Sequence, residues 1–157
     1  MQRRVAFNNL DGGVSLSNPL PIFDGETREQ QLAREISRIE IAGLAVGQPV
    51  IVNLTDIPDA QDGRREYRNA LVLSGTAVVT DMAKARAIHL DRIRKVRDKK
   101  LQELDVQSIR AIEDKDVPTE NRIKAEKQVL RDLPATFDLT PATNTDELRG
   151  LWPTELA

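Results

Sequence analysis

Cysteine is absent from this 157-residue sequence, and aromatic residues are scarce. Without cysteine the chain forms no disulfide, carries no thiol nucleophile and offers no thiolate to a metal, which fits a reducing compartment. The aromatic residues are only Phe7, Phe23, Tyr67, Phe137 and Trp152. With 39% hydrophobic residues, 31% charged residues and a mean hydropathy of -0.43, the composition favours thin, helix-rich packing over an enzyme core with a deep pocket.

Long apolar runs are also missing. No stretch approaches the roughly 18 consecutive apolar residues of a membrane-spanning helix, so we expect no membrane span. The N-terminal stretch MQRRVAFNNLDGG has a basic pair but no apolar run behind it, so we expect no signal peptide.

Enzyme and cofactor signatures are lacking as well. The sequence contains no GxSxG, no Walker phosphate loop, no GxGxxG and no EF-hand spacing. Its one histidine, His89, falls within the apolar arc of a predicted helix, which indicates a packing or interface residue. At an interface its charge would titrate near neutral pH. We predict no catalytic residue, no metal site and no cofactor.

The net charge of -2 conceals a segregation of charge along the chain. Residues 81–104 carry 8 Lys or Arg and 4 Asp or Glu, whereas residues 105–157 carry 7 and 11. The basic segment is either a phosphate-binding surface or a solvated helix face whose charge is balanced by the acidic segment packed beside it. The second interpretation is favoured, because acidic residues interleave and no aromatic stacking residue lies in the segment.

Residues 1–80 predict a small mixed α/β region. Residues 5–16 form a hairpin around Asp11-Gly12-Gly13, and Pro19 and Pro21 exclude a helix in the loop that follows. Thr27 and Gln30 have capping-box spacing, so a helix runs from there towards Gly43 and buries Leu32, Ile36 and Ile39. A β-branched strand at 50–54 and a second hairpin at 70–79 complete the region.

Helices dominate the chain from Asp81. Residues 81–105 have an apolar arc of Met82, Ala85, Leu90, Ile93, Val96, Leu101 and Leu104, and Thr80 or Asp81 caps the start. We expect a second short helix after Asp105, with Val106, Ile109 and Ile112 on one side. A third helix over 120–133, with Ile123, Val129, Leu130 and Leu133 inward, ends at Pro134. Short connections favour antiparallel neighbours, hence a helical hairpin or three-helix unit over 81–133.

Residues 134–157 predict a loop with an apolar tag. Thr143 and Asp146 have the spacing of a cap for a last helical turn, which carries Leu148, Leu151 and Trp152. The overall prediction is an α+β chain of three parts: residues 1–80, 81–133 and 134–157.

An ordered set of short motifs over residues 65–155 resembles small proteins encoded in the tail gene clusters of tailed bacteriophages and prophages. The matching positions are Lys84-Ala85-Arg86, Ile93-Arg94, Leu101 through Asp105, Arg110-Ala111 with Glu113, Leu130-Arg131-Asp132 with Pro134, and Trp152-Pro153. The first 60 residues resemble no family.

The resemblance implies a non-enzymatic tail protein. It is either a structural tail or baseplate component that contacts a tail-fibre or hub protein, or a tail-fibre assembly chaperone that leaves before the virion is complete. The implied location is the virion tail, or the host cytoplasm during assembly. A third hypothesis is a nucleic-acid-binding regulator that uses residues 84–100. It is less favoured, because the basic segment lacks a helix-turn-helix context.

Six residues are candidates for the partner interface. Arg94, Lys95 and Lys99 project from the basic helix and suit an acidic partner. Leu148, Leu151 and Trp152 form the apolar tag, which either docks in a partner pocket or folds back over residues 81–133. The basic and acidic segments also make a homo-oligomer plausible.

Overall fold

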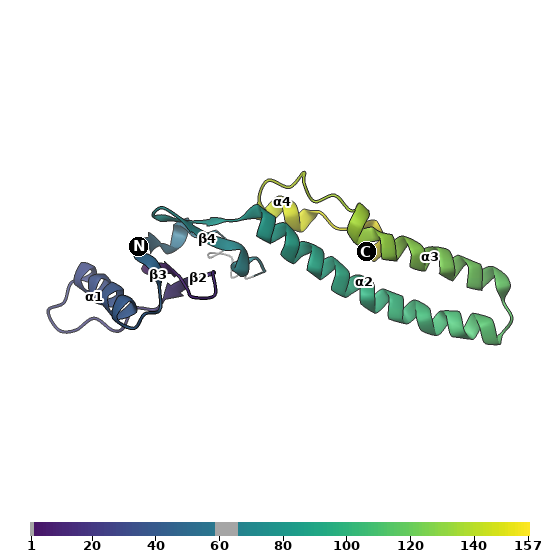
Figure 1. Ribbon diagram of the computed structural model, residues 1–157, viewed down its shortest axis with the longest axis horizontal. Coiled ribbons are helices and arrows are strands. Elements are labelled where there is room, and N and C mark those ends of the chain that lie inside the picture. Colours follow the sequence, from purple (N-terminus) through teal and green to yellow (C-terminus); the bar gives the residue numbers. More distant parts are fainter. Residues whose placement is uncertain (1, 59–65) are drawn as a thin grey trace. The chain divides into compact units, whose positions relative to one another are not determined.

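A computed structural model describes residues 2–58 and 66–157 of the chain (Figure 1). The chain divides into two compact units, Met1–Ala85 and Arg86–Ala157. The division falls inside the longest helix, five residues after the boundary predicted from the sequence. Strands and helices are both present, and the fold is α+β with a C-terminal helical hairpin.

A three-stranded antiparallel sheet forms the centre of the first unit. Its strands are β1 (Arg3–Asn8), β2 (Val14–Ser17) and β3 (Val46–Asn53), in the order β2-β1-β3. The predicted hairpin around Asp11-Gly12-Gly13 is confirmed as β1 and β2. Asn9 closes the turn, because its Oδ1 accepts from the Gly13 amide at 2.8 Å.

The two faces of this sheet bury different partners, as the alternation of a strand requires. Val5 and Phe7 of β1 pack against Leu32 and Ile39 of helix α1 (Arg28–Ile41). On the opposite face, Ala6, Val14 and Val52 pack with Leu71 and Val78 of a second hairpin, β4 (Leu71–Ser74) and β5 (Ala77–Thr80). The first unit therefore has three layers: α1, the sheet and the β4–β5 hairpin.

Local capping chemistry fixes where α1 begins. The Thr27 side chain accepts from the Gln30 amide while the Gln30 side chain accepts from the Thr27 amide, so the predicted capping box is confirmed. Short 3₁₀ turns, η1 (Leu54–Asp56) and η2 (Arg68–Ala70), complete the connections of the unit.

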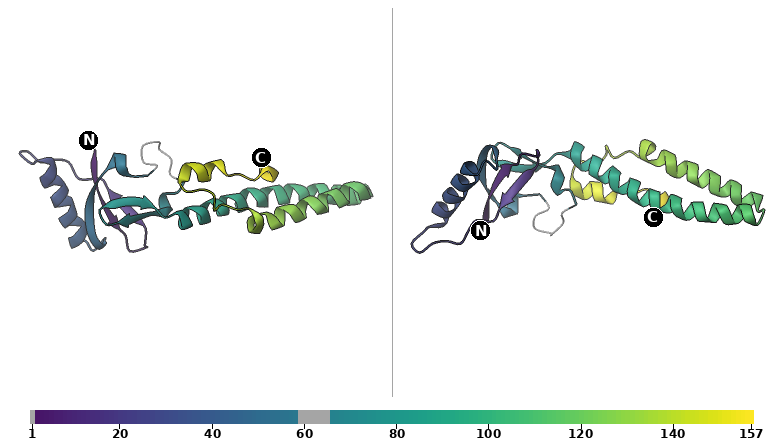
Figure 2. Two further views of the ribbon diagram at one scale, coloured as in Figure 1. Left: turned by 90° about the horizontal axis from the view of Figure 1, so that it is seen from above. Right: turned by 60° about the horizontal axis from the view of Figure 1, so that its bottom comes forward.

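Helices α2 (Met82–Glu113) and α3 (Val117–Thr136) form the antiparallel hairpin of the second unit, side by side in Figures 1 and 2. The buried side chains of each helix recur at helical spacing along one face; they are Ala85, His89, Ile93, Leu104 and Ala111 on α2, and Ile123, Leu130 and Leu133 on α3. A short helix α4 (Thr145–Gly150) and the 3₁₀ turn η3 (Thr154–Leu156) follow. No helix among the described residues is long and apolar enough to cross a membrane.

Two predictions about these helices are wrong. No second helix starts after Asp105; α2 continues to Glu113, because residues 82–113 contain neither glycine nor proline to stop it. The turn comes at Lys115, which has a φ of 55°. Pro134 does not end α3, which continues to Thr136. A proline in the last turn removes its own amide, whereas the Phe137 amide still reaches the Leu133 carbonyl at 2.9 Å.

Several side chains predicted to be inward are instead exposed. Val96, Val106, Ile109 and Ile112 on α2 and Val129 on α3 have exposed fractions of 37% to 57%. The predicted cap of the last helical turn is also displaced by one residue. Asn144 caps α4 by accepting from the Glu147 amide at 2.9 Å, and the Thr143 amide and hydroxyl bind the Glu147 carboxylate.

Candidate protein-interaction site

The three cationic candidates lie on the solvent side of α2. Arg94, Lys95 and Lys99 are all exposed. Lys95 pairs with Asp91, one turn earlier on the same helix, at 3.0 Å. Such exposed pairs contribute little stability, about 0.2–1 kcal/mol. These cations are therefore accessible from solvent, and we expect their removal to leave the hairpin intact.

The three apolar candidates are packed within the second unit. Leu148 is fully buried, and Leu151 and Trp152 are partly buried. The Leu151 carbonyl lies 2.8 Å from Nε2 of His89, and the Trp152 ring contacts the His89 ring edge-on. The structure thus shows the alternative in which Trp152 folds back onto the helical hairpin.

Side chains of α2 hold the rest of the C-terminal segment by donating to its backbone carbonyls. Arg86 donates to the carbonyls of Leu139 and Ala142, at 3.1 and 2.8 Å. Lys100 donates through Nζ to the Glu155 carbonyl at 2.7 Å. His89 itself is buried and belongs to this packing. In the part of the chain that the structure describes, no group of three or more His, Asp or Glu side chains could hold a metal ion.

The loop of residues 18–27, between β2 and α1, carries an apolar surface that the sequence analysis missed. Leu20, Ile22 and Phe23 have exposed fractions of 49%, 49% and 61%. Neighbouring exposed apolar side chains on a surface make a candidate interaction site. We call residues 20–23 the docking loop.

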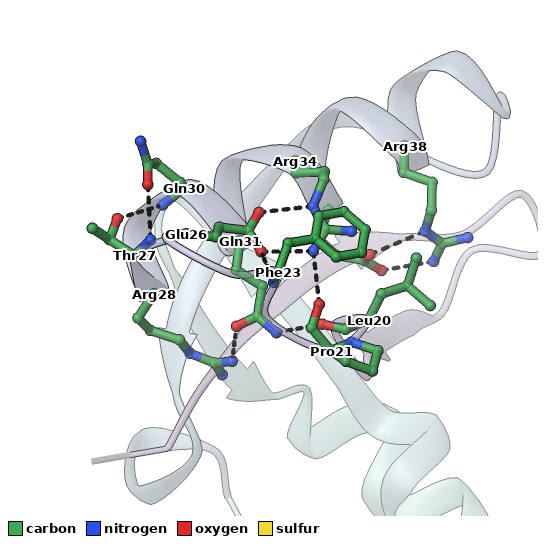
Figure 3. Close-up of polar contacts among 11 residues, drawn as sticks. Leu20, Pro21, Phe23, Glu26, Thr27, Arg28, Gln30, Gln31, Arg34 and Arg38 are labelled. Carbon is green, nitrogen blue, oxygen red and sulfur yellow. Dashed lines mark hydrogen bonds and ion pairs between the residues drawn. The ribbon is translucent and has the colours of Figure 1, made fainter.

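Side chains of α1 fix the backbone of the docking loop (Figure 3). Gln31 donates through Nε2 to the Leu20 carbonyl, and Arg34 donates through Nη2 to the Pro21 carbonyl at 2.9 Å. The Phe23 amide donates to Oε2 of Glu26 at 2.9 Å. The carbonyls of Leu20 and Pro21 are thus bound from α1, and the Phe23 amide is bound by Glu26, which precedes the helix. The side chains of Leu20, Ile22 and Phe23 remain exposed.

Arg34 is the centre of this network. Its Nε and Nη2 reach the two carboxylate oxygens of Glu26 at 2.8 and 2.9 Å. These bonds hold the pKa of Glu26 below its ordinary value. Glu26 therefore stays ionised and continues to accept the hydrogen bond from the Phe23 amide. The Arg34 guanidinium also lies 4.1 Å from the centre of the Phe23 ring, a cation–π contact that orients the ring.

The buried end of the network ties the loop to the sheet. Gln31 is almost fully buried and accepts from Arg28, which in turn donates to the Arg3 carbonyl of β1 at 2.6 Å. The proline rings of Pro19 and Pro21 fix two further backbone angles. The backbone of the docking loop is therefore fixed by contacts with α1, Glu26 and, through Arg28, β1. A loop fixed in this way loses less conformational entropy on binding than a free one.

One sequence signal could have identified this loop. Leu20, Ile22 and Phe23 are apolar residues in a proline-punctuated stretch that belongs to neither a helical nor a strand period. The sequence analysis used the prolines only to exclude a helix. Apolar side chains with no periodic element to bury them are candidates for exposure.

A depression of about 490 Å³ in the first unit is a weaker candidate. It lies between the β1–β2 turn and η2, and its lining includes Asn9, Asp11, Ser15, Arg68 and Lys84. Ligand pockets are mostly apolar and enclosed, whereas this lining is polar and its charged side chains are exposed. The docking loop is the better supported site.

Comparison with known proteins gives no relative: no protein-family model, no curated protein and no solved structure matches the chain.

Proposed function

We propose that this chain is a non-enzymatic, protein-binding component of a bacteriophage tail or baseplate, and that it contacts a tail-fibre or hub protein through its docking loop. The observation that carries the binding role is the loop itself. Leu20, Ile22 and Phe23 are exposed on a backbone that Gln31, Arg34 and Glu26 hold fixed.

The chemistry of the loop suits a protein partner with an apolar recess. Aromatic side chains near the centre of an interface commonly supply much of the binding free energy, and Phe23 is the most exposed of the three. Its guanidinium partner, Arg34, is already paired with Glu26 and brings no unpaired charge into the contact.

The motif resemblance supports the phage setting. Its residues lie mainly on α2 and α3, where Leu104, Ala111 and Leu130 are buried. The motifs therefore combine buried core positions of the second unit with exposed charged positions, a helical scaffold that members of such a group would share. The docking loop lies in the first unit, where the sequence resembles no family and specificity for one partner would reside.

Quantitative mass spectrometry of purified particles tests the setting. A built-in tail component is present at a fixed small multiple of the other tail proteins. Absence from particles, together with binding to soluble fibre, would identify an assembly chaperone instead. Absence together with no binding to fibre or hub would refute a tail function.

Binding of the purified chain to purified fibre and hub proteins from the same gene cluster tests the loop. Phe23→Ser should weaken binding at least 10-fold, as expected of an aromatic hot spot worth more than about 1.4 kcal/mol. Ile109→Ser is the matched control, since Ile109 is similarly exposed on α2. Equal effects of the two substitutions would remove the docking loop from the proposal.

A further inference from the structure

The edges of the two sheets in the first unit are not equally protected. An edge strand presents unpaired N–H and C=O groups, and natural proteins blunt such edges with proline, charge or bulges. The edge at β3 is blunted: Gly47 has a φ of 77°, Pro49 lacks an amide, and the register with β1 shifts between Ala6 and Asn8. At the other edge, β2 approaches β4.

Strand β5 has none of these devices. Its residues Ala77, Val78, Val79 and Thr80 include no charge and no proline, and its four-residue register with β4 is continuous. Of the strands that the structure describes, only β4 pairs with β5. The opposite side of β5 is thus a regular edge rich in β-branched residues, the kind that favours pairing with another strand.

The hairpin geometry shows which backbone groups face outward. A two-residue turn, in which Gly75 has a φ of 60°, closes on the pair Ser74 and Ala77. The Asp81 amide donates to the Ala70 carbonyl at 2.8 Å at the other end. Because bonded and non-bonded pairs alternate in an antiparallel ladder, Ala77 and Val79 bond to β4, whereas Val78 and Thr80 direct their N–H and C=O groups away from it.

We infer that β5 pairs antiparallel with β5 of a second copy of this chain, which makes a continuous four-stranded sheet β4-β5-β5-β4. A two-fold contact requires a surface complementary to itself. A two-fold axis at Val79 places Val78 of one copy opposite Thr80 of the other, so each outward N–H meets an outward C=O. No charged residue lies in residues 71–80, so self-pairing brings no like charges together.

The side chains agree with this pairing. Val78 is buried in the core of its own unit and stays there, whereas Val79 is 38% exposed on the opposite face of the strand. Across the two-fold axis Val79 lies beside its own copy, in the closest arrangement of a cross-strand pair. Pairing therefore buries an exposed valine without disturbing the existing core. The contact depends on β5 alone, not on the docking loop or its partner.

Sedimentation velocity on the full chain tests the inference, at protein concentrations up to about 1 mM, where even a millimolar dissociation constant is detected. The chain and Val79→Thr should both shift from monomer to dimer as concentration rises, since threonine keeps the β-branched shape. Val79→Lys should stay monomeric, because it places two lysines side by side, and its circular dichroism should match that of the unsubstituted chain. A chain that stays monomeric throughout, or a dimer that Val79→Lys does not weaken, would overturn the inference.

Amide hydrogen exchange locates the contact without any substitution. The amides of Val78 and Thr80 should exchange at least several-fold more slowly at high than at low protein concentration, while the Val79 amide, already bonded to β4, should not change. Exchange at Val78 and Thr80 that is independent of concentration would place any dimer elsewhere and refute the pairing. Phe23→Ser should dimerise normally, so the outcome is separate from that of the docking loop.

Discussion

The indole ring of Trp152 meets the imidazole ring of His89 edge-on, with 5.8 Å between ring centroids and 90° between ring planes. The same imidazole lies 2.8 Å from the Leu151 carbonyl, a contact between residues 62 positions apart in the sequence. Because His89 is buried on α2, these contacts fasten the C-terminal segment to the helical hairpin.

Trp152→Ala should therefore destabilise the second unit. A fully buried tryptophan costs about 3–5 kcal/mol when truncated; Trp152 is partly buried, so we expect about 2 kcal/mol. Chemical denaturation followed by far-UV circular dichroism measures the change. Leu10→Ala, at an exposed turn residue, is the control and should change the free energy of unfolding by less than about 0.5 kcal/mol. A stable Trp152→Ala protein would show that the segment is not part of the core.

Features that depend on neighbouring residues were predictable from the sequence. The Asp11-Gly12-Gly13 turn and the Thr27–Gln30 capping box both came from local chemistry, and the structure contains both. Whether an apolar stripe is buried depends on what packs against it. Val106 and Ile109 have helical spacing, yet they lie on the side of α2 that no described element covers, so periodicity alone overestimated the core.

The candidate site was less predictable, because it depends on contacts between distant segments. Trp152 and His89 gave no sequence signal of their contact. The docking loop required knowing that Gln31 and Arg34, which lie on a helix face, bind the carbonyls of Leu20 and Pro21. The cationic candidates Arg94, Lys95 and Lys99 are exposed as helical spacing indicates.

Acid should weaken the first unit partly through Glu35. Hydrogen bonds from Arg38, at 2.6 and 3.0 Å, together with one from Ser17, hold the pKa of this carboxyl below its ordinary value of 4.5. Since the folded pKa is lowered, its stabilisation is complete above about pH 4.5 and is lost as the pH falls through the folded value.

Glu35→Gln tests this assignment. The side chain is only 2% exposed, so loss of its charge-assisted bonds should cost about 2 kcal/mol at neutral pH. The variant should also lose less stability than the unsubstituted chain between pH 5 and pH 3, about the range of carboxyl titration. Glu29→Gln, at an exposed carboxyl paired with Arg3, should leave neutral-pH stability nearly unchanged. An unchanged acid profile in Glu35→Gln would contradict the role of Glu35.

Arg34→Met should release the docking loop without removing any of its apolar side chains. The substitution deletes the bonds to Glu26 and to the Pro21 carbonyl and the contact with the Phe23 ring. We expect faster exchange of the Phe23 amide and weaker partner binding through a higher dissociation rate. Arg34→Lys should be intermediate, because an ammonium group cannot reproduce the two-pronged contact. Full binding by Arg34→Met would mean that the fixed conformation is irrelevant.

The exposed cations of α2 should affect association rate and not folding. Replacing Arg94, Lys95 and Lys99 together by glutamine should leave thermal stability nearly unchanged, since all three side chains are exposed and the Lys95–Asp91 pair is solvated. If the partner is acidic, the association rate should fall about 3–10-fold at low salt and lose most of its salt dependence. Stopped-flow measurements across ionic strengths distinguish this from Phe23→Ser, which should act on dissociation. An unchanged association rate would exclude these side chains from the interface.

Asp81 should set the start of α2 through its side chain. Its Oδ1 accepts from the amides of Ala83 and Lys84, at 2.9 and 3.1 Å, which confirms one of the two predicted caps. Asp81→Ala leaves both amides without this acceptor and should lower the free energy of unfolding by about 1 kcal/mol. Asp81→Asn keeps a capping oxygen and should cost only about a few tenths of a kcal/mol. Amide exchange at Ala83 and Lys84 should accelerate in the alanine variant and much less in the asparagine variant. Equal acceleration in both variants would indicate that the negative charge at the helix start, and not the hydrogen bond, stabilises α2.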